Sequence, residues 1–346
     1  AIDGVGAYED DQFQAKGAFT LAGLPATPAA LDLSALRPQG ALTLTGVPGA
    51  LARLAPGDVG VIANEALGER FDLSISSPAP PASLASLAGK DGASLRIDLK
   101  GQSLTGATDI RFLGRDLWIG PTGADLNATP ALVTAIGRLA QSDSALPTLE
   151  RAARIRVDVQ PFAISRADDG SFDPRTLRPI MVMASSPDDV VLGNLPIGPE
   201  GTPRMVGLRK LTVGAAYHRN DMVASEGSIR ATIFDPADPA PSIAELDIVS
   251  GLILPRPPAI TASIARIDTA RLDRLLARPG LTSDALGAEA GISLLAAPTG
   301  AGQPLAYRFT LRSTKLNADG ALIELRDRIQ LASPVALTWE APASWL

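Results

Sequence analysis

Apolar and polar residues alternate without a break in Ile155-Arg156-Val157-Asp158-Val159-Gln160, and this alternation decides the fold class. Successive side chains of a β-strand point to opposite faces, so a period of two places Ile155, Val157 and Val159 together on one face. One apolar, buried face and one polar, solvated face are typical of antiparallel sheets. The same alternation recurs at 41–45, 71–76, 95–100, 211–213, 229–233, 307–312 and 335–340.

Helical periodicity is confined to three short segments, 48–54, 129–140 and 268–278. Thr129 before Pro130 is a good N-cap, and Pro279-Gly280 is expected to end the third helix. Helices this short are not stable alone, so each is expected to lie against a sheet. The sequence therefore predicts a mainly β fold of antiparallel twisted sheets, forming an open trough or a sandwich, with two or three short amphipathic helices.

The length of 346 residues fits two domains or one elongated domain. A proline-rich stretch, 195–203, marks a soft boundary near residue 200. We expect a first β-rich repeat region over 1–200, with helices near 48–54 and 129–140. A second β-rich repeat region over 201–346 carries the helix near 268–278. One continuous curved sheet is the alternative.

An internal repeat relates Asn64-Glu65-Ala66-Leu67-Gly68 to Ser283-Asp284-Ala285-Leu286-Gly287. Each motif follows a helical segment and a polar loop, and each precedes a strand. We interpret the recurrence as duplication of a helix-and-strand unit. Coincidence in a chain rich in Ala, Leu and Gly is the alternative, and 129–160 is a looser relative.

Composition argues against several classes of function. With 31 Lys and Arg against 37 Asp and Glu, the net charge is −6, which does not favour nucleic acid or an anionic membrane surface. The chain has no cysteine and therefore no disulfide, cysteine-bound zinc or thiol nucleophile. The single histidine, His218, fits a solvated turn better than a catalytic base. We expect no enzymatic activity, no cofactor and no metal site.

The apolar side of the predicted sheet is too large for a few short helices to cover. Either the sheet closes on itself, or two sheets pack, or an aliphatic groove stays open. An open apolar surface normally marks a binding site, and acyl chains are the ligand that suits a charge-free groove. The predicted groove residues, each with ordinary core packing as its alternative, are Leu51, Leu54, Leu95, Ile97, Leu99, Leu132, Ile136, Leu139, Ile155, Val157, Val159, Leu272, Leu275 and Leu276.

The order Gly46-Val47-Pro48, Leu51, Leu54, Glu65-Ala66-Leu67-Gly68 and Phe71-Asp72-Leu73-Ser74 resembles the repeat unit of AsmA/TamB-like bacterial envelope proteins. The resemblance implies β-rich repeats that curl into an elongated trough with an apolar inside, anchored by an N-terminal helix. In several members it implies phospholipid movement or outer-membrane assembly. The given sequence shows no such anchor, so we expect it to be a piece of a longer protein. Its short amphipathic helices are more frequent than in the longest members, so we expect at most a distant relative.

Two functions from different classes follow. The first is a non-enzymatic protein of the periplasm or cell envelope that binds or conducts phospholipid or another acyl-chain lipid along an aliphatic β-groove, with envelope proteins as further partners. The second is a structural or assembly subunit whose β-sandwich edges pair with partners or with copies of itself, giving an oligomer. An enzyme built around His218 ranks third.

Overall fold

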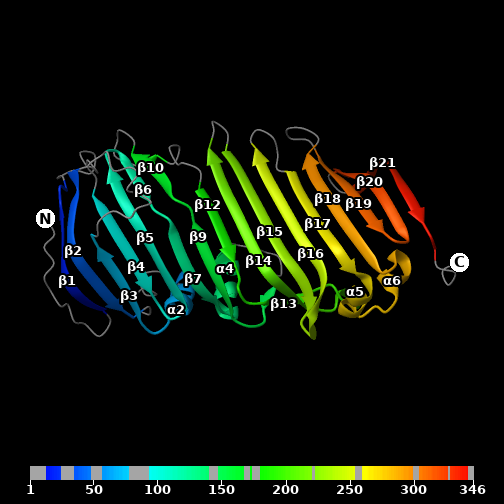
Figure 1. Cartoon of the computed structure of the whole chain (residues 1–346), viewed down its shortest axis with the longest axis horizontal. Helices are drawn as coiled ribbons and strands as arrows, with labels where there is room; N and C mark the ends of the chain where they lie inside the picture. Colours follow the sequence, from blue (N-terminus) through cyan, green and yellow to red (C-terminus); the bar gives the residue numbers. More distant parts are fainter. Residues whose placement is uncertain are drawn as a thin grey trace. The chain divides into compact units, whose positions relative to one another are not determined.

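A computed structural model describes residues 13–24, 35–47, 57–77, 93–139, 147–166, 172–173, 180–219, 223–253, 259–298, 304–325 and 328–341. The chain divides into two compact units. The first comprises 1–144 and 154–183, and the second comprises 145–153 and 184–346. Each unit is built on an antiparallel β-sheet (Figure 1).

The sheet of the first unit begins with five strands, each paired with the next along the chain. They are β1 (Phe13–Ala22), β2 (Arg37–Gly46), β3 (Phe71–Ser76), β4 (Ser94–Lys100) and β5 (Leu104–Leu113). The short strands β6 (Asp116–Ile119) and β7 (Thr122–Ala128) both pair with β5 and act as one strand interrupted at Gly120-Pro121. Beyond them lie β9 (Ala153–Val159), β10 (Phe162–Arg166) and β11 (Phe172–Asp173). Strand β12 (Ile180–Ser185) follows at the boundary between the units.

Two helices pack together in the first unit, α2 (Asp58–Leu67) and α4 (Pro130–Leu139). The Thr129 hydroxyl accepts a hydrogen bond from the Leu132 N–H at 3.1 Å, which confirms its predicted role as an N-cap. The same hydroxyl donates to Glu65 Oε2 at 2.7 Å, and this bond ties the start of α4 to α2.

In the second unit, each strand from β13 onward pairs with the next. These strands are β13 (Val190–Leu195), β14 (Arg204–Arg219), β15 (Val223–Asp235), β16 (Asp238–Ile253), β17 (Ala259–Asp268), β18 (Glu289–Pro298), β19 (Leu305–Ser313), β20 (Leu316–Leu325) and β21 (Arg328–Trp339). The short strand β8 (Thr148–Leu149) also pairs with β13. A short 3₁₀ turn, η4 (Pro199–Gly201), precedes β14. Helices α5 (Thr269–Leu276) and α6 (Leu281–Leu286) connect β17 to β18.

The predicted fold class is confirmed: the chain is mainly β, with open antiparallel sheets and few helices. Each predicted strand matches an observed one, although those at 155–160 and 335–340 run one residue past the ends of β9 and β21. The helices predicted at 129–140 and 268–278 are α4 and α5. The helix predicted at 48–54 lies outside the described residues. Two further helices, α2 and α6, occur where a loop was expected, which brings the described α-helices to four rather than two or three.

The helix α2 was missed because its sequence favours a strand. Val59, Val61 and Ile62 are β-branched and Gly60 is a weak helix former, so local propensity argues against a helix here. Packing against α4 and the hydrogen bond between Thr129 and Glu65 stabilise this helix despite its low helix propensity. The six-residue α6 is too short to show a period.

The internal repeat is present in the fold, and its motif is the end of a helix. Gly68 and Gly287 each follow a helix with positive φ, 76° and 84°, and each N–H bonds the carbonyl four residues earlier. In both copies a hairpin turn further along the chain donates to the leucine carbonyl of the motif. The Gln102 N–H bonds Leu67 O at 2.9 Å, and the Lys315 N–H bonds Leu286 O at 3.2 Å. The order β2, α2, β3, β4, β5 therefore corresponds to β17, α6, β18, β19, β20.

Candidate functional site

The strand register of the second unit gathers aliphatic side chains on one face, here called the apolar face. Residues directly opposite each other on paired strands project to the same side of a sheet. Two rows of such partners cross the strands from β14 to β21. The first row is Val213, Ile229, Ile248, Ala262, Leu294 and Phe309, and the second is Ala231, Leu246, Ile264, Ile292, Leu311, Ala318 and Leu337.

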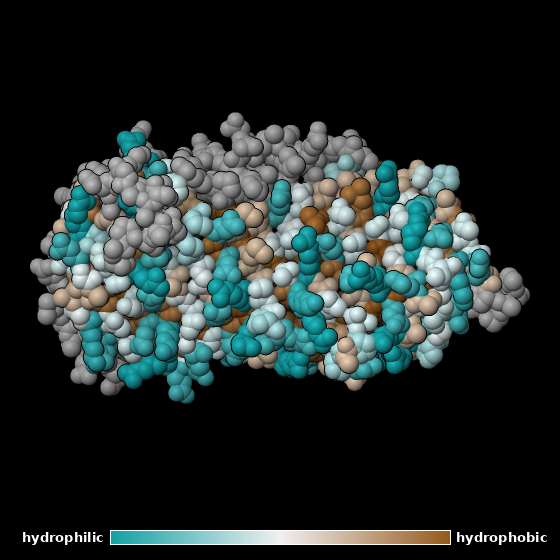
Figure 2. Space-filling view, in the orientation of Figure 1, coloured by the Kyte–Doolittle hydropathy of each residue, from teal (hydrophilic) through white to brown (hydrophobic). Residues whose placement is uncertain are grey.

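The opposite face carries charged pairs between neighbouring strands. Arg230 lies 3.3 Å from Asp247, Arg266 lies 2.9 Å from Glu245, and Arg312 lies 2.7 Å from Asp319. The hydrogen bond from Arg312 lowers the pKa of the Asp319 carboxyl. Figure 2 shows hydrophilic residues in teal spread over the visible face, with apolar residues between them. Exposed ion pairs of this kind add little stability, but their charges favour exposure of this face to solvent.

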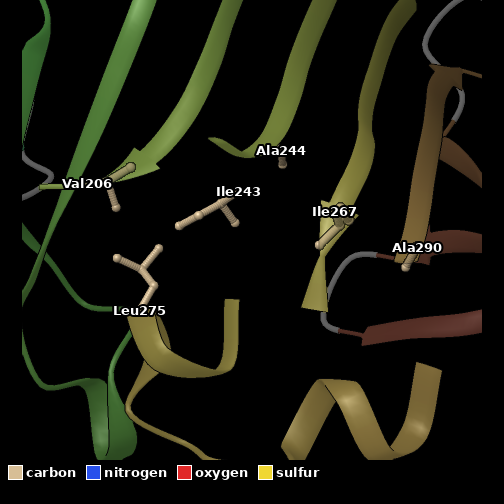
Figure 3. Close-up of a cluster of buried hydrophobic side chains, with 6 residues drawn as sticks. All are labelled: Val206, Ile243, Ala244, Ile267, Leu275 and Ala290. Carbon is tan, nitrogen blue, oxygen red and sulfur yellow. The ribbon is translucent and has the colours of Figure 1, made fainter. Parts of the chain in front are cut away.

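Helices α5 and α6 cover one end of the apolar face. Leu275 of α5 points toward Val206 and Ile243, and this cluster also includes Ile267 and Ala290 (Figure 3). Leu272, Leu286, Leu208, Ile233 and Ile264 pack against it. Ile243 is 2% exposed, so this end is sealed as an ordinary core.

A buried carboxylate holds the two helices in place. Asp273 of α5 is 2% exposed and accepts hydrogen bonds from the N–H groups of Thr282 and Ser283, at 2.6 and 3.1 Å. It also accepts from both of their hydroxyls at 2.6 Å. Burial raises the pKa of this carboxyl, but these four bonds outweigh it and lower the pKa. Asp273 therefore stays ionised and fixes α6 against α5.

Beyond the helices, the aliphatic side chains of the apolar face are partly open. Val213 and Ile229 in the first row are 39% and 37% exposed, and Ile292 in the second row is 42% exposed. Each stands beside other aliphatic residues: Ile292, for example, lies between Ile264 and Leu311. A contiguous apolar surface of this kind differs from scattered exposed residues, which are normal on any protein.

Equally exposed apolar residues on the opposite face are isolated. Val249 is 42% exposed and lies between Ser228 and Thr261. Leu295 is 38% exposed and lies between Thr261 and Arg308. The two faces therefore differ in the continuity of their apolar surface rather than in the exposure of single residues.

The first unit has a smaller face of the same kind. Leu44, Leu73 and Leu99 are direct partners across β2, β3 and β4, and the next row is Leu42, Ile75 and Ile97. These side chains are half-buried. A cluster of Leu36 and Phe112, joined by Leu21, Leu95 and Ile110, packs at one end of these strands.

The predicted groove residues fall into several environments. Leu95, Ile97 and Leu99 lie half-buried on the face of the first unit, and Ile155, Val157 and Val159 are half-buried in β9. On α4, Leu132 is 1% exposed whereas Ile136 is 46% exposed. Leu275 is buried in the core, with Leu272 and Leu276 half-buried beside it. Leu51, Leu54 and the side chain of Leu139 lie outside what the structure describes.

None of the residues in the two rows of the second unit was among the predicted groove residues. Ile248, Ile264 and Ile292, for example, were not among the predicted residues, and each has a polar neighbour on one side only. Their alternation is interrupted by alanines and glycines, which weakens the pattern. Only the strand register shows that they adjoin.

Other kinds of site receive no support from the described residues. No group of three or more His, Asp or Glu side chains among them is placed to hold a metal ion. His218 lies one residue before the end of β14. Among the described helices, none has the length and apolar character to cross a membrane.

Comparison with known proteins gives no relative: no family model, no curated protein and no solved structure matches this chain.

Proposed function

We propose that this protein binds or conducts phospholipid, or another acyl-chain lipid, along the apolar face, and that it does so without catalysing a reaction. The observation that carries the proposal is the contiguous, partly open aliphatic surface that continues beyond α5 and α6. The sequence resemblance to AsmA/TamB-like proteins supports the same function and favours a location in the periplasm or cell envelope.

The dimensions of the face suit a hydrocarbon chain. The first row crosses six strands, from β14 to β19, and neighbouring strands are about 4.8 Å apart, so the row is roughly 24 Å long. The hydrocarbon core of a bilayer is about 30 Å thick, so one leaflet contributes about 15 Å of acyl chain. A single chain therefore fits along one row.

The energetics also suit lipid. Each methylene removed from water contributes about 0.8 kcal/mol. Because the exposed residues of both rows are aliphatic, an acyl chain lying on them desolvates no protein charge. The ion pairs lie on the other face, where a headgroup would not compete with them.

The test compares two matched pairs of substitutions. Lipids are extracted from the purified protein with organic solvent and identified by mass spectrometry, for the wild-type chain and for each variant. Ile229→Asp with Ile292→Asp places two charges on the apolar face, whereas Val249→Asp with Leu295→Asp places two charges at equally exposed sites on the opposite face.

We expect phospholipid to co-purify with the wild-type protein and with the Val249/Leu295 variant, and to fall at least tenfold in the Ile229/Ile292 variant. Circular dichroism of each variant checks that it is folded. Lipid-free wild-type protein that also takes up none from vesicles would overturn the proposal. Equal loss of lipid from both variants would do the same.

A further inference from the structure

The last strand of the second unit has a counterpart inside the chain. In the first copy of the repeat, β5 is followed by the interrupted strand β6–β7; in the second copy, β20 is followed by β21. Both hairpins turn between directly paired residues, Leu113 with Asp116 and Leu325 with Arg328. In both pairs of strands, an equivalent backbone hydrogen bond joins the end of the second strand to the residue just before the first. The Asn127 N–H donates to Ser103 O at 2.7 Å, and the Glu340 N–H donates to Lys315 O at 2.9 Å.

A proline occupies the same place in both strands. Leu104 pairs with Leu126 and Leu316 pairs with Trp339, and the prolines, Pro121 and Pro334, each lie five residues before the second partner. Proline lacks an N–H and usually marks an edge strand. Strand β6–β7 is nevertheless an inner strand, so Pro334 does not prevent β21 from pairing on its outer side.

The two corresponding strands, β6–β7 and β21, differ in their neighbours. Strand β6 pairs with β10 through Phe162 opposite Ile119, and β7 pairs with β9. Among the described strands, β21 has β20 as its one neighbour. Its apolar residues are correspondingly open: Ile329, Leu331 and Leu337 are 64%, 58% and 60% exposed.

The first strand of the chain is in the same situation. Strand β1 precedes β2 as β16 precedes β17, and β2 corresponds to β17 in the repeat. Strand β16 pairs on its other side with β15 over its whole length. Among the described strands, β1 pairs with β2.

We propose that β21 of one molecule pairs antiparallel with β1 of a second molecule, so that copies of this chain join head to tail. This junction gives each outer strand the second neighbour that its inner counterpart has. It also matches the faces: Leu331 and Leu337 lie on the side of β21 that carries Leu322 and Ala318 of β20, and Ala15 and Phe19 of β1 lie on the side of Leu44. Symmetric pairing of β21 with β21 would leave β1 with β2 as its one neighbour among the strands that the structure describes.

The two surfaces that meet are different, so the junction is heterologous, and each added copy presents a new β21. Such a junction extends as an open chain or closes into a ring, depending on the rotation that relates one copy to the next. The apolar face of one molecule then adjoins the smaller aliphatic face on β2, β3 and β4 of the next. The pairing is independent of lipid binding and could hold if the proposed function fails.

The absence of cysteine permits a direct test. One set of chains carries Lys16→Cys or Ala18→Cys on β1, and the other carries Gln330→Cys or Thr338→Cys on β21; all four residues are exposed. Each chain is oxidised alone and after mixing, up to its solubility limit. Antiparallel neighbours bring Cα atoms to about 4.5–5.5 Å, within disulfide range.

We expect a disulfide-linked dimer when a β1 chain is mixed with a β21 chain, and none when either is oxidised alone. A chain carrying both Lys16→Cys and Thr338→Cys should give a ladder of multimers. Dimers of β21 chains alone would show symmetric pairing and overturn the proposal, as would the absence of any cross-link. The same cross-links in the Ile229→Asp, Ile292→Asp background would separate this result from lipid binding.

Discussion

At the scale of single residues, Asp273 shows how a polar group stabilises an otherwise apolar end of the sheet. Its carboxylate is nearly inaccessible to water and accepts four hydrogen bonds from two consecutive residues of α6. Removing it leaves the N–H groups of Thr282 and Ser283 and the Ser283 hydroxyl without this acceptor, whereas the Thr282 hydroxyl can still donate to Thr269 O at 3.0 Å. Each unsatisfied buried donor is costly.

We expect Asp273→Ala to lower the free energy of unfolding by about 2–3 kcal/mol, because hydrogen bonds to a charged group are each worth about 1.5–3 kcal/mol and part of the loss is recovered by water. Asp284→Ala, an exposed carboxylate on α6, is the control and should cost less than about 1 kcal/mol. Urea denaturation measures both. A cost at Asp273 no larger than that at Asp284 would contradict this role.

The same carboxylate predicts a pH dependence. Its pKa is lower in the folded protein than in the unfolded chain, so the unfolded state binds the proton more tightly. Its stabilisation is full above the unfolded pKa, about 3.9, and is lost as the pH falls through the folded pKa. The difference in unfolding free energy between wild type and Asp273→Ala should therefore be constant near neutral pH and shrink below about pH 4. A difference that grows in acid would refute the assignment.

At the scale of elements, the two helix ends at Gly68 and Gly287 fix the start of the strand that follows each. Both glycines have a positive φ that other residues rarely adopt. A Cβ at Gly68 would meet the side chain of Gln102, and one at Gly287 would meet that of Thr314. Both neighbours lie in the turn that donates to the helix end.

Gly68→Ala and Gly287→Ala should each destabilise the protein by about 1–3 kcal/mol, through backbone strain together with displacement of the turn. Gly114→Ala separates the two causes, since Gly114 also has positive φ (60°) but open space around it. It should cost about 1 kcal/mol. Thermal unfolding of the three variants makes the comparison, and equal effects would show that the turn contact contributes nothing.

The elements also show what the sequence can and cannot predict. Strands such as 71–76 and α4 were predictable because alternation and an N-cap at Thr129 are local signals. The helix α2 was not, since α4 stabilises it from a distance in the chain. The row that joins Ile229 to Ile248 and Ala262 depends on pairing register, which no single strand encodes.

At the scale of the whole molecule, lipid binding to the apolar face should stabilise the folded protein. A ligand bound only by the native state adds about 2.7 kcal/mol at a hundred times its Kd. A monodisperse lysophospholipid should therefore raise the thermal midpoint of the wild-type chain and of the Val249→Asp, Leu295→Asp variant. It should leave the midpoint of the Ile229→Asp, Ile292→Asp variant unchanged. Equal shifts in both variants would show that the lipid binds elsewhere.

The central claim is that the aliphatic rows beyond α5 and α6 are open to an acyl chain. A phospholipid with a photoreactive diazirine in its acyl chain tests this most directly, with the attachment sites mapped by peptide mass spectrometry. The account predicts adducts on the apolar face, at Ile229, Ile264 and Ile292. Adducts confined to Val249 and Leu295 on the charged face, or no adducts at all, would contradict it.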